Sequence, residues 1–526
     1  MRSHCPRSCP RTVIKRRFRN FDPELFCNDL SMVPFDVAYI FNDVDDISWA
    51  WSTLVAGVLD VRAPITRSTV KREHVPYMTP ELLDAIRRHN KLKRLYNKSK
   101  NSTDRVRYKN QRNFTSSLRR KLISGYLRTT ADNARGNPRT FWRAIKPFMH
   151  CKSNTSEDII HLKEDTSLIT DKLEVAEIFN KYYSFVLCDS DSSINRHTVV
   201  DYLSSNHQSI SAIRTHCPVA QPFQFRHVTS PELEILLKSL DPKKATGHDN
   251  IPPKALRTGA TVFAYPLSVL SNKIIDSGKV PAKWKLAEIC PVFKKNDAQD
   301  KAMYRPVSIL VILDKVFEKC LEHQLIEYFN PILSPSLSAY RRGYSCESVP
   351  GESVLLRLIE DWRSALDNKC VVSAVIMDLT KAFDMIPHNL LLAKLAAYGI
   401  SSSSLVLLDG YLRGRTQRVK IEDVTSGVLD ISKGVPQGSV LGPLFFNIFL
   451  NDLFYVIKRA KLSNYADDNQ MYFCDRDPQV VKSVINDELA VACKWFDDNK
   501  LEPNPTKCKA LVLSNKHSLN LKFTIR

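Results

Sequence analysis

Residues 464–473, with the sequence NYADDNQMYF, constrain the fold of this chain more than any other segment. Apolar and aromatic residues flank a polar centre, a pattern typical of a β-hairpin with buried strands and a polar tip. Asp467 and Asp468 lie at that tip. Paired Asp residues are also common in surface turns, but here the flanking residues are of buried types. Because adjacent carboxylates repel each other, we expect a cation to neutralise them.

A further carboxylate, Asp378, follows a segment that reads as a buried strand. Residues 370–377, CVVSAVIM, are apolar and rich in β-branched side chains, which favours a strand covered on both faces. An Asp at the end of such a strand needs a partner to offset its loss of hydration. The simplest alternative is that Asp378 caps the helix that follows, and from this segment alone that alternative is favoured.

A third segment, residues 434–443 (GVPQGSVLGP), contains three glycines and leads into an apolar stretch that predicts a helix. Glycines allow a backbone to approach another group closely. By itself such a loop is a weak indication of phosphate or nucleotide binding, and it matches neither the Walker nor the dinucleotide pattern.

Taken together and in this order, the three segments resemble the polymerase motifs of reverse transcriptases, with Tyr465-Ala466-Asp467-Asp468 as the most specific of them. Further segments resemble the LINE-type, jockey-like non-LTR retrotransposons in particular. These are residues 244–252, 281–285 with 291–295, and 304–310, the Asn-Pro-x-Lys turn at residues 504–508, and residues 49–64 with the basic helices after them. The stretch 337–346 resembles a template-contacting segment, but Leu337, Tyr344 and Cys346 stand where the family has Gln, His and Thr.

The resemblance implies an α/β (α+β) right-hand polymerase fold, with a palm sheet and helical fingers preceded by a basic helical region. We expect an N-terminal linker remnant at residues 1–75, the basic helical region at 76–150 and a polar connector at 151–230. The reverse transcriptase domain follows at 231–526, with its core at about 275–526. On this interpretation the chain is truncated, since the endonuclease and most of the thumb are missing.

The resemblance also implies two-metal phosphoryl transfer from dNTPs to a primer 3′-hydroxyl. Asp378 and Asp467 are expected to bridge two Mg²⁺ ions, for which Mn²⁺ is a possible substitute. The carbonyl of Leu379 would assist, and Asp468 would complete the acidic cluster. Mg²⁺ prefers oxygen ligands, which suits this donor set.

Four further residues are expected to contact the nucleotide. By resemblance, Phe383 excludes a ribose 2′-hydroxyl, although an ordinary core Phe is the simpler alternative. Gln437 resembles a residue that contacts nucleotide and template, and Arg305 one that holds the triphosphate through its forked donors. Lys507 either binds the triphosphate or supports the hairpin.

The net charge of +20 is concentrated, because residues 71–150 contain 21 Lys and Arg but only 5 Asp and Glu. A helix is expected to begin at Thr79-Pro80, since Thr is a good N-cap and Pro suits the first helical position. Amphipathic helices with solvated charges would explain this region, and so would helices that bind nucleic acid. The candidate nucleic-acid-binding residues are Arg87, Arg88, Lys91, Arg119, Arg120 and Lys121.

No apolar run approaches the roughly 20 residues needed to cross a bilayer, and the 13 scattered cysteines favour reduced thiols in an intracellular protein, in the cytoplasm or the nucleus. The expected partners are an RNA template, a DNA primer and dNTPs. Three functions are compatible with the sequence. The main one is an RNA-directed DNA polymerase. The alternatives are an inactive retroelement relic that only binds nucleic acid, and an intron maturase, against which the fingers and linker segments argue.

Overall fold

The computed structural model describes residues 11–70, 77–133, 141–142, 160–164, 167–187, 198–219, 221–339, 341, 354–466 and 468–515. Its contacts divide the chain into two compact units. One unit contains residues 1–15 and 66–159, and the other contains residues 16–65 and 160–526. Helices and strands are both abundant, which agrees with the predicted α/β class.

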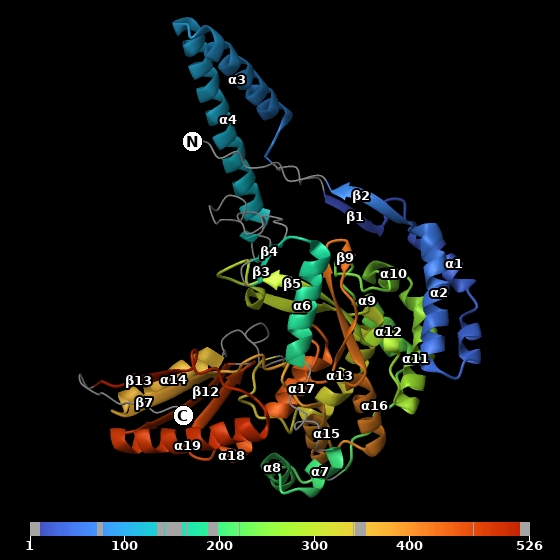
Figure 1. The fold of residues 1–526 in the computed structure, drawn as a ribbon, viewed down its shortest axis with the longest axis vertical. Helices are drawn as coiled ribbons and strands as arrows, with labels where there is room; N and C mark the ends of the chain where they lie inside the picture. The colour runs from blue at the N-terminus through green and yellow to red at the C-terminus, as the bar shows by residue number, and fades with distance from the viewer. Residues whose placement is uncertain are drawn as a thin grey trace. The chain divides into compact units, whose positions relative to one another are not determined.

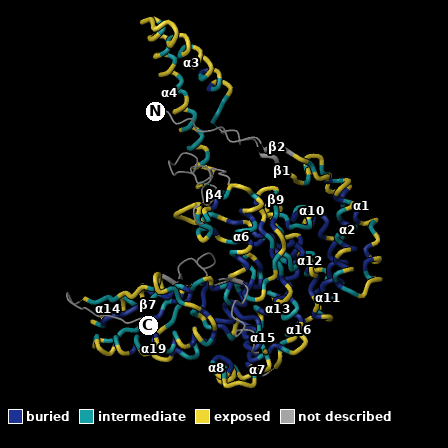
Figure 2. Tube along the Cα trace, in the orientation of Figure 1, coloured by how far each residue is buried: buried dark blue, intermediate teal, exposed yellow. Residues whose placement is uncertain are grey.

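The smaller unit is built on the helices α3 (Pro80–Ser99) and α4 (Ser102–Asn133), and most of a two-stranded sheet of β1 (Arg11–Arg16) and β2 (Ile65–Val70) also belongs to it. The predicted start of α3 is confirmed, because the Thr79 hydroxyl accepts a hydrogen bond from the Leu82 amide at 3.3 Å. The carbonyl of Ala85 accepts bonds from Gln111 and Thr115 of α4. Most side chains of α3 and all of those of α4 remain exposed or half-buried (Figure 2).

The larger unit contains the remaining elements. Its described helices are α1 (Pro23–Ser31), η1 (Phe35–Ile40), α2 (Val44–Arg62), α6 (Lys172–Leu187), α7 (Val199–Ser204), α8 (Gln208–His216), α9 (Ser230–Lys238), α10 (Pro253–Thr258), α11 (Ala260–Ser277), α12 (Ala282–Lys285), η4 (Lys301–Met303), α13 (Ile312–Phe329), α14 (Val354–Asp367), α15 (His388–Ala397), α16 (Ser402–Leu412), α17 (Leu441–Leu450), α18 (Leu453–Val456) and α19 (Pro478–Asp498). Its described strands are β3 (Leu162–Glu164), β4 (Ser167–Ile169), β5 (Leu286–Phe293), β6 (Tyr304–Ile309), β7 (Val371–Asp378), β8 (Arg415–Ile421), β9 (Val424–Thr425), β10 (Leu429–Ile431), β11 (Lys461–Tyr465), β12 (Asp468–Asp475) and β13 (Lys509–Leu513).

The sheet that carries the predicted carboxylates has the strand order β11-β12-β7-β13, and all of its neighbours are antiparallel. The helices α14 and α19 pack on opposite sides of it (Figure 1). Ala374 and Tyr472 belong to a small cluster with Leu358 of α14, whereas Val375 and Met471 belong to the main core that includes α19. This alternation is the period of two that a doubly covered strand requires. The predicted buried strand is therefore confirmed as β7.

A second sheet, ordered β10-β8-β5-β6 with β9 paired to β8, lies beside α6. Its β5 and β8 strands are parallel, and its other neighbours are antiparallel. The buried face of α6 shares one apolar cluster with these strands. The cluster includes Val175, Phe179 and Tyr183 of α6, and Ala287, Ile289, Val419 and Ile421 of the sheet. α6 is thus an integral layer of this sheet.

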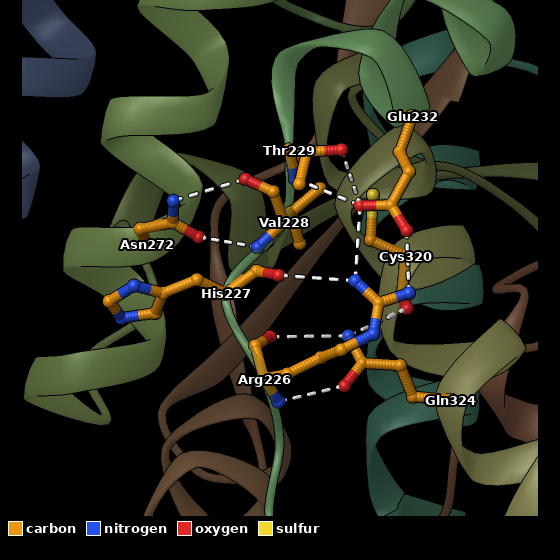
Figure 3. Close-up of polar contacts among 8 residues, drawn as sticks. All are labelled: Arg226, His227, Val228, Thr229, Glu232, Asn272, Cys320 and Gln324. Atoms are coloured by element: carbon orange, nitrogen blue, oxygen red, sulfur yellow. Dashed lines mark hydrogen bonds and ion pairs between the residues drawn. The ribbon is translucent and has the colours of Figure 1, made fainter.

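An extended segment before α9 is held to the helical core by side-chain amides rather than by a strand. Gln324 of α13 accepts a hydrogen bond from the Arg226 amide at 2.9 Å and donates one to its carbonyl at 3.3 Å. Asn272 of α11 makes the same pair of bonds with Val228, at 2.7 and 3.1 Å. Figure 3 shows the two amides holding the segment from opposite sides. They satisfy backbone groups that would otherwise be unpaired.

Candidate catalytic site

The predicted hairpin is confirmed as β11 and β12, which pair from Lys461↔Tyr472 to Tyr465↔Asp468. Tyr465 and Asp468 are thus the last paired residues before and after the turn. Ala466 has φ of +58°, as the favoured two-residue hairpin turns require. The buried side chain of Asn464 donates to the Ala466 carbonyl at 2.8 Å and to Asn469 Oδ1 at 2.9 Å. These bonds fix the tip, although Asp467 itself lies outside the described residues.

Asp378 and Asp468 are directly opposite each other at the ends of β7 and β12. Directly paired residues of antiparallel strands have their Cα atoms about 4.5–5.5 Å apart and their side chains on one face. Both carboxylates therefore project from the face that carries Ala374 and Tyr472. The sheet brings together two of the three predicted catalytic residues, which are 90 positions apart in the sequence.

Asp378 does not cap a helix, which corrects the alternative that its own segment favoured. The next described helix of four residues or more, α15, begins ten positions later. The Asp378 carboxylate instead accepts a hydrogen bond from Lys507 Nζ at 2.5 Å. The backbone carbonyl of Asp378 accepts one from the backbone N–H of Asn504 at 2.7 Å. The Thr380 amide donates to the Glu502 carbonyl at 2.8 Å. The Asn-Pro-x-Lys turn is thus attached to the end of β7, a contact that no local sequence pattern indicates.

The glycine-rich loop packs against the chain that follows Asp378. Gly434 has φ of +80°, and a Cβ atom placed on it would lie 2.7 Å from the Asp384 carbonyl oxygen. Gln437 Nε2 donates to both carboxylate oxygens of Asp384, at 3.0 and 3.1 Å. Burial raises the pKa of Asp384 to about 6. The predicted apolar helix follows the loop as α17, and sequence reasoning had assigned no role to Asp384.

Phe383 lies in the same chain segment, five residues after Asp378. Its ring is half-buried and stacks on Phe446 of α17, with the ring centroids 4.8 Å apart. The Val435 amide of the glycine-rich loop donates to the Phe383 carbonyl at 2.9 Å. Phe383 is therefore held where the segment after Asp378 meets the glycine-rich loop. This position fits both a residue that excludes a ribose 2′-hydroxyl and an ordinary core residue.

Arg305 lies exposed on β6, opposite Val292 of β5. The pKa of Lys294, which follows β5 directly, is lowered by burial and then by the positive charges of Arg305 and Lys507, while Asp378 opposes the shift. Each of these charges is therefore near enough to Lys294 to act on it. The predicted triphosphate-binding cations and Asp378 thus all lie within electrostatic range of Lys294.

The stretch 337–346 lies partly outside the described residues, which exclude Tyr344 and Cys346. Leu337 pairs in parallel with Asn464 of β11, and the Asn464 amide donates to the Ser336 carbonyl at 3.0 Å. The segment therefore runs beside the hairpin. Leu379, whose carbonyl was a predicted metal ligand, pairs with Pro503 of the Asn-Pro-x-Lys segment.

The donor set around Asp378 fits a hard divalent cation. Asp378 and Asp468 supply carboxylate oxygens on one face, and the 19% exposed side chain of Asp378 already pairs with a cation, Lys507 Nζ. Oxygen donors are what Mg²⁺ and Mn²⁺ prefer. Within the part of the chain that the structure describes, no group of three His, Cys, Asp or Glu side chains could hold a metal; Asp467 is outside that part.

In the smaller unit, the six predicted nucleic-acid-binding residues are all exposed or half-buried. Arg87 pairs with Asp84 on the same helix at 3.1 Å. Arg87, Lys91, Arg94 and Lys98 follow one another at helical spacing along one hollowed face of α3. This face is a continuous basic stripe. Among the described helices of the whole chain, none is long and apolar enough to cross a membrane.

The chain is similar to known proteins over its second half. Residues 293–524 match the family described as reverse transcriptase (RNA-dependent DNA polymerase), whose members generally use divalent metal ions. Over 297 residues the chain is 26% identical to the RNA-directed DNA polymerase from the mobile element jockey of Drosophila melanogaster. The aligned region covers 55% of this chain and 32% of that protein. Probable RNA-directed DNA polymerases from transposons of the same species are also similar. The one from transposon BS is 27% identical over 307 residues (55% of this chain, 32% of that protein), and the one from the X-element is 29% identical over 235 residues (43% and 25%). The chain thus spans about a third of the length of the first two relatives.

Proposed function

We propose that this chain, whose residues 293–524 match the reverse transcriptase family and which is similar to RNA-directed DNA polymerases of mobile elements, copies an RNA template into DNA. The observation that carries the proposal is the pairing of Asp378 with Asp468 at the end of a sheet, beside the Tyr-Ala-Asp-Asp turn. Carboxylates held side by side on a rigid sheet suit the binding of metal ions.

Asp378, Asp467 and Asp468 would hold two Mg²⁺ ions, with the Leu379 carbonyl as a further ligand and Mn²⁺ as a possible substitute. When bound, the ions supply positive charge to the pyrophosphate and lower the pKa of the primer 3′-hydroxyl. The protein's own contribution is to fix the carboxylates in place. Asn464 does so for the hairpin tip, and Asn504 does so for the end of β7.

The nucleotide would lie between this acidic end and the junction of β6 with the glycine-rich loop. Arg305 and Lys507 would bind the triphosphate, and their effect on the pKa of Lys294 supports placing them at one site. Phe383 would exclude a ribose 2′-hydroxyl, since its stacking on Phe446 leaves the ring little freedom to move away. Gln437 would contact the nucleotide or its template partner.

In the right-hand description of polymerases, the β7 sheet with α14 and α19 would be the palm, and the β8 sheet with α6 would belong to the fingers. The domain boundaries at residues 75, 150 and 230 remain part of the proposal. The basic helical region would bind nucleic acid through Arg87, Arg88, Lys91, Arg119, Arg120 and Lys121. The partners would be an RNA template, a DNA primer and dNTPs, inside the cell.

The proposal can be tested by primer extension on poly(rA)/oligo(dT) with dTTP and Mg²⁺. The wild type, Asp467→Asn and Asp475→Asn would be compared, because Asp475 lies at the far end of β12 and controls for a general effect on that strand. We expect extension by the wild type and by Asp475→Asn, and loss of extension in Asp467→Asn. Salt-sensitive RNA binding without extension by the wild type would contradict a polymerase and leave a nucleic-acid-binding protein.

A further inference from the structure

The chain after Asp378 and the glycine-rich loop are bonded into one rigid piece. The Gly434 amide donates to the Ile386 carbonyl and the Val435 amide to the Phe383 carbonyl, both at 2.9 Å. His388 Nε2 donates to the Gly434 carbonyl at 2.7 Å, and burial lowers the pKa of this histidine to about 4, so it is neutral at physiological pH. Neither segment can move without the other.

Gln437 is held within this piece through both its backbone and its side chain. Its carbonyl accepts a bond from the Ser308 amide at 3.1 Å, which fixes the backbone to β6 three residues after Arg305. Its side-chain nitrogen lies 3.0 and 3.1 Å from the two carboxylate oxygens of Asp384, a residue that is only 9% exposed. Gln437 and Asp384 line the same cavity, together with Pro306 and Ser308.

The chemistry of Asp384 determines how the Gln437 amide is oriented. An ionised carboxylate only accepts hydrogen bonds, so the NH₂ group of Gln437 must face it. The carbonyl oxygen, Oε1, is then directed away from Asp384. A bond to a charged acceptor is also about twice as strong as a neutral one, which makes this orientation the preferred one.

We propose that Asp384 is a positioning residue, which fixes the Gln437 amide so that Oε1 is presented as an acceptor to a hydrogen-bond donor of the bound nucleotide. The inference rests on the proposed function and adds the direction of the hydrogen bond, in which Gln437 accepts and the nucleotide donates. The ligand group that Gln437 recognises is an N–H or O–H, and not a phosphate oxygen. Asp384 itself does not touch the substrate.

The test compares Asp384→Asn, Gln437→Glu and the double exchange of Asp384→Asn with Gln437→Glu. In Asp384→Asn the Gln437 amide has no charged acceptor and adopts either orientation, so we expect KM for dTTP to rise roughly five- to tenfold with kcat within about threefold. Gln437→Glu places two carboxylates against each other and should be worse. In the double variant the new amide at position 384 donates to the new carboxylate at position 437, whose second oxygen replaces Oε1. KM should then return to within about threefold of the wild type.

Asp276→Asn serves as the matched control, since Asp276 of α11 is exposed and its carboxylate lies 2.7 Å from Nε2 of the exposed His227. Each variant would also be titrated with dTTP in the presence of a primer that ends in a dideoxynucleotide. This primer cannot be extended, so the titration measures dTTP binding alone. An unchanged KM and dTTP affinity in Asp384→Asn would overturn the inference, as would a double variant no better than the single ones. An inactive wild type that still shows these differences in dTTP binding would contradict the proposed polymerase and leave the positioning role standing.

Discussion

Replacing Lys394 by Met should destabilise the larger unit severely, because it would leave a buried carboxylate without its cation. Lys394 of α15 and Asp452 are both fully buried, with Nζ 2.6 Å from Oδ1. The ammonium also donates to the Phe449 carbonyl at 2.8 Å and lies 4.7 Å from the centre of the Trp495 ring. Burial lowers the pKa of Lys394 to about 8. Through Trp495 this pair joins α15 to α19, and α19 supports the β7 sheet.

The expected cost follows from what Asp452 retains. In Lys394→Met its Oδ2 still accepts the Trp495 indole N–H at 2.7 Å, but Oδ1 loses the ammonium. Removing one member of a buried ion pair costs about 3–5 kcal/mol, a large part of the roughly 5–15 kcal/mol typical of a folded domain. Urea unfolding followed by tryptophan fluorescence would measure this loss.

Two controls make this prediction refutable. The double variant Lys394→Met with Asp452→Asn has no buried charge and keeps an acceptor for Trp495, so it should recover most of the lost free energy. Lys238→Met breaks a solvent-accessible pair with Glu234 on one helix and should leave the free energy of unfolding almost unchanged. A loss below about 1 kcal/mol in Lys394→Met, or a double variant as unstable as the single one, would show that the buried charge of Asp452 does not need Lys394.

Three further predictions concern the site, the pH dependence of stability and the basic helices. Phe383→Val should reduce the preference for dTTP over UTP by roughly tenfold or more, measured as the ratio of kcat/KM values, and an unchanged ratio would make Phe383 a core residue only. Because burial raises the pKa of Asp384 to about 6, above the ordinary 3.8, the native state binds that proton more tightly. The free energy of unfolding of the wild type should therefore fall by about 3 kcal/mol from this group as pH rises from about 4 to 6. Asp384→Asn lacks this titration, so its free energy of unfolding in urea should rise by that amount relative to the wild type over the same pH range. A difference between the two proteins that stays constant with pH would contradict the shift. Substituting Arg87 and Lys91 by Gln should weaken RNA binding and lower the slope of log affinity against log salt by about 1 for each lost phosphate contact, whereas an unchanged slope would show that these charges are only solvated.

Local sequence patterns were sufficient for the elements that carry the candidate site. Apolar, β-branched residues predicted β7, and the polar tip between apolar flanks predicted the β11–β12 hairpin. The Thr79-Pro80 pair predicted the start of α3. In each case the determining interactions lie within a few residues, so the pattern records them directly.

The contacts that complete the site could not be predicted in this way. Lys507 meets Asp378 across 129 positions, and Gln437 meets Asp384 across 53. Neither pair leaves a periodic trace, because each depends on how separate elements pack. The same holds for α6, which lies in the expected polar connector and whose packing against β8 no local pattern indicated. Asp467 remains a prediction from the family motif alone.

We propose that this chain makes DNA as directed by RNA, through the carboxylates at the end of the β7 sheet. The most direct measurement is to extend a primer on an RNA template of mixed sequence with four dNTPs and Mg²⁺, and to sequence the product of the wild type and of Asp378→Asn. We expect the wild type to make a product complementary to the template and Asp378→Asn to make none. A product that does not follow the template, or equal synthesis by Asp378→Asn, would contradict it.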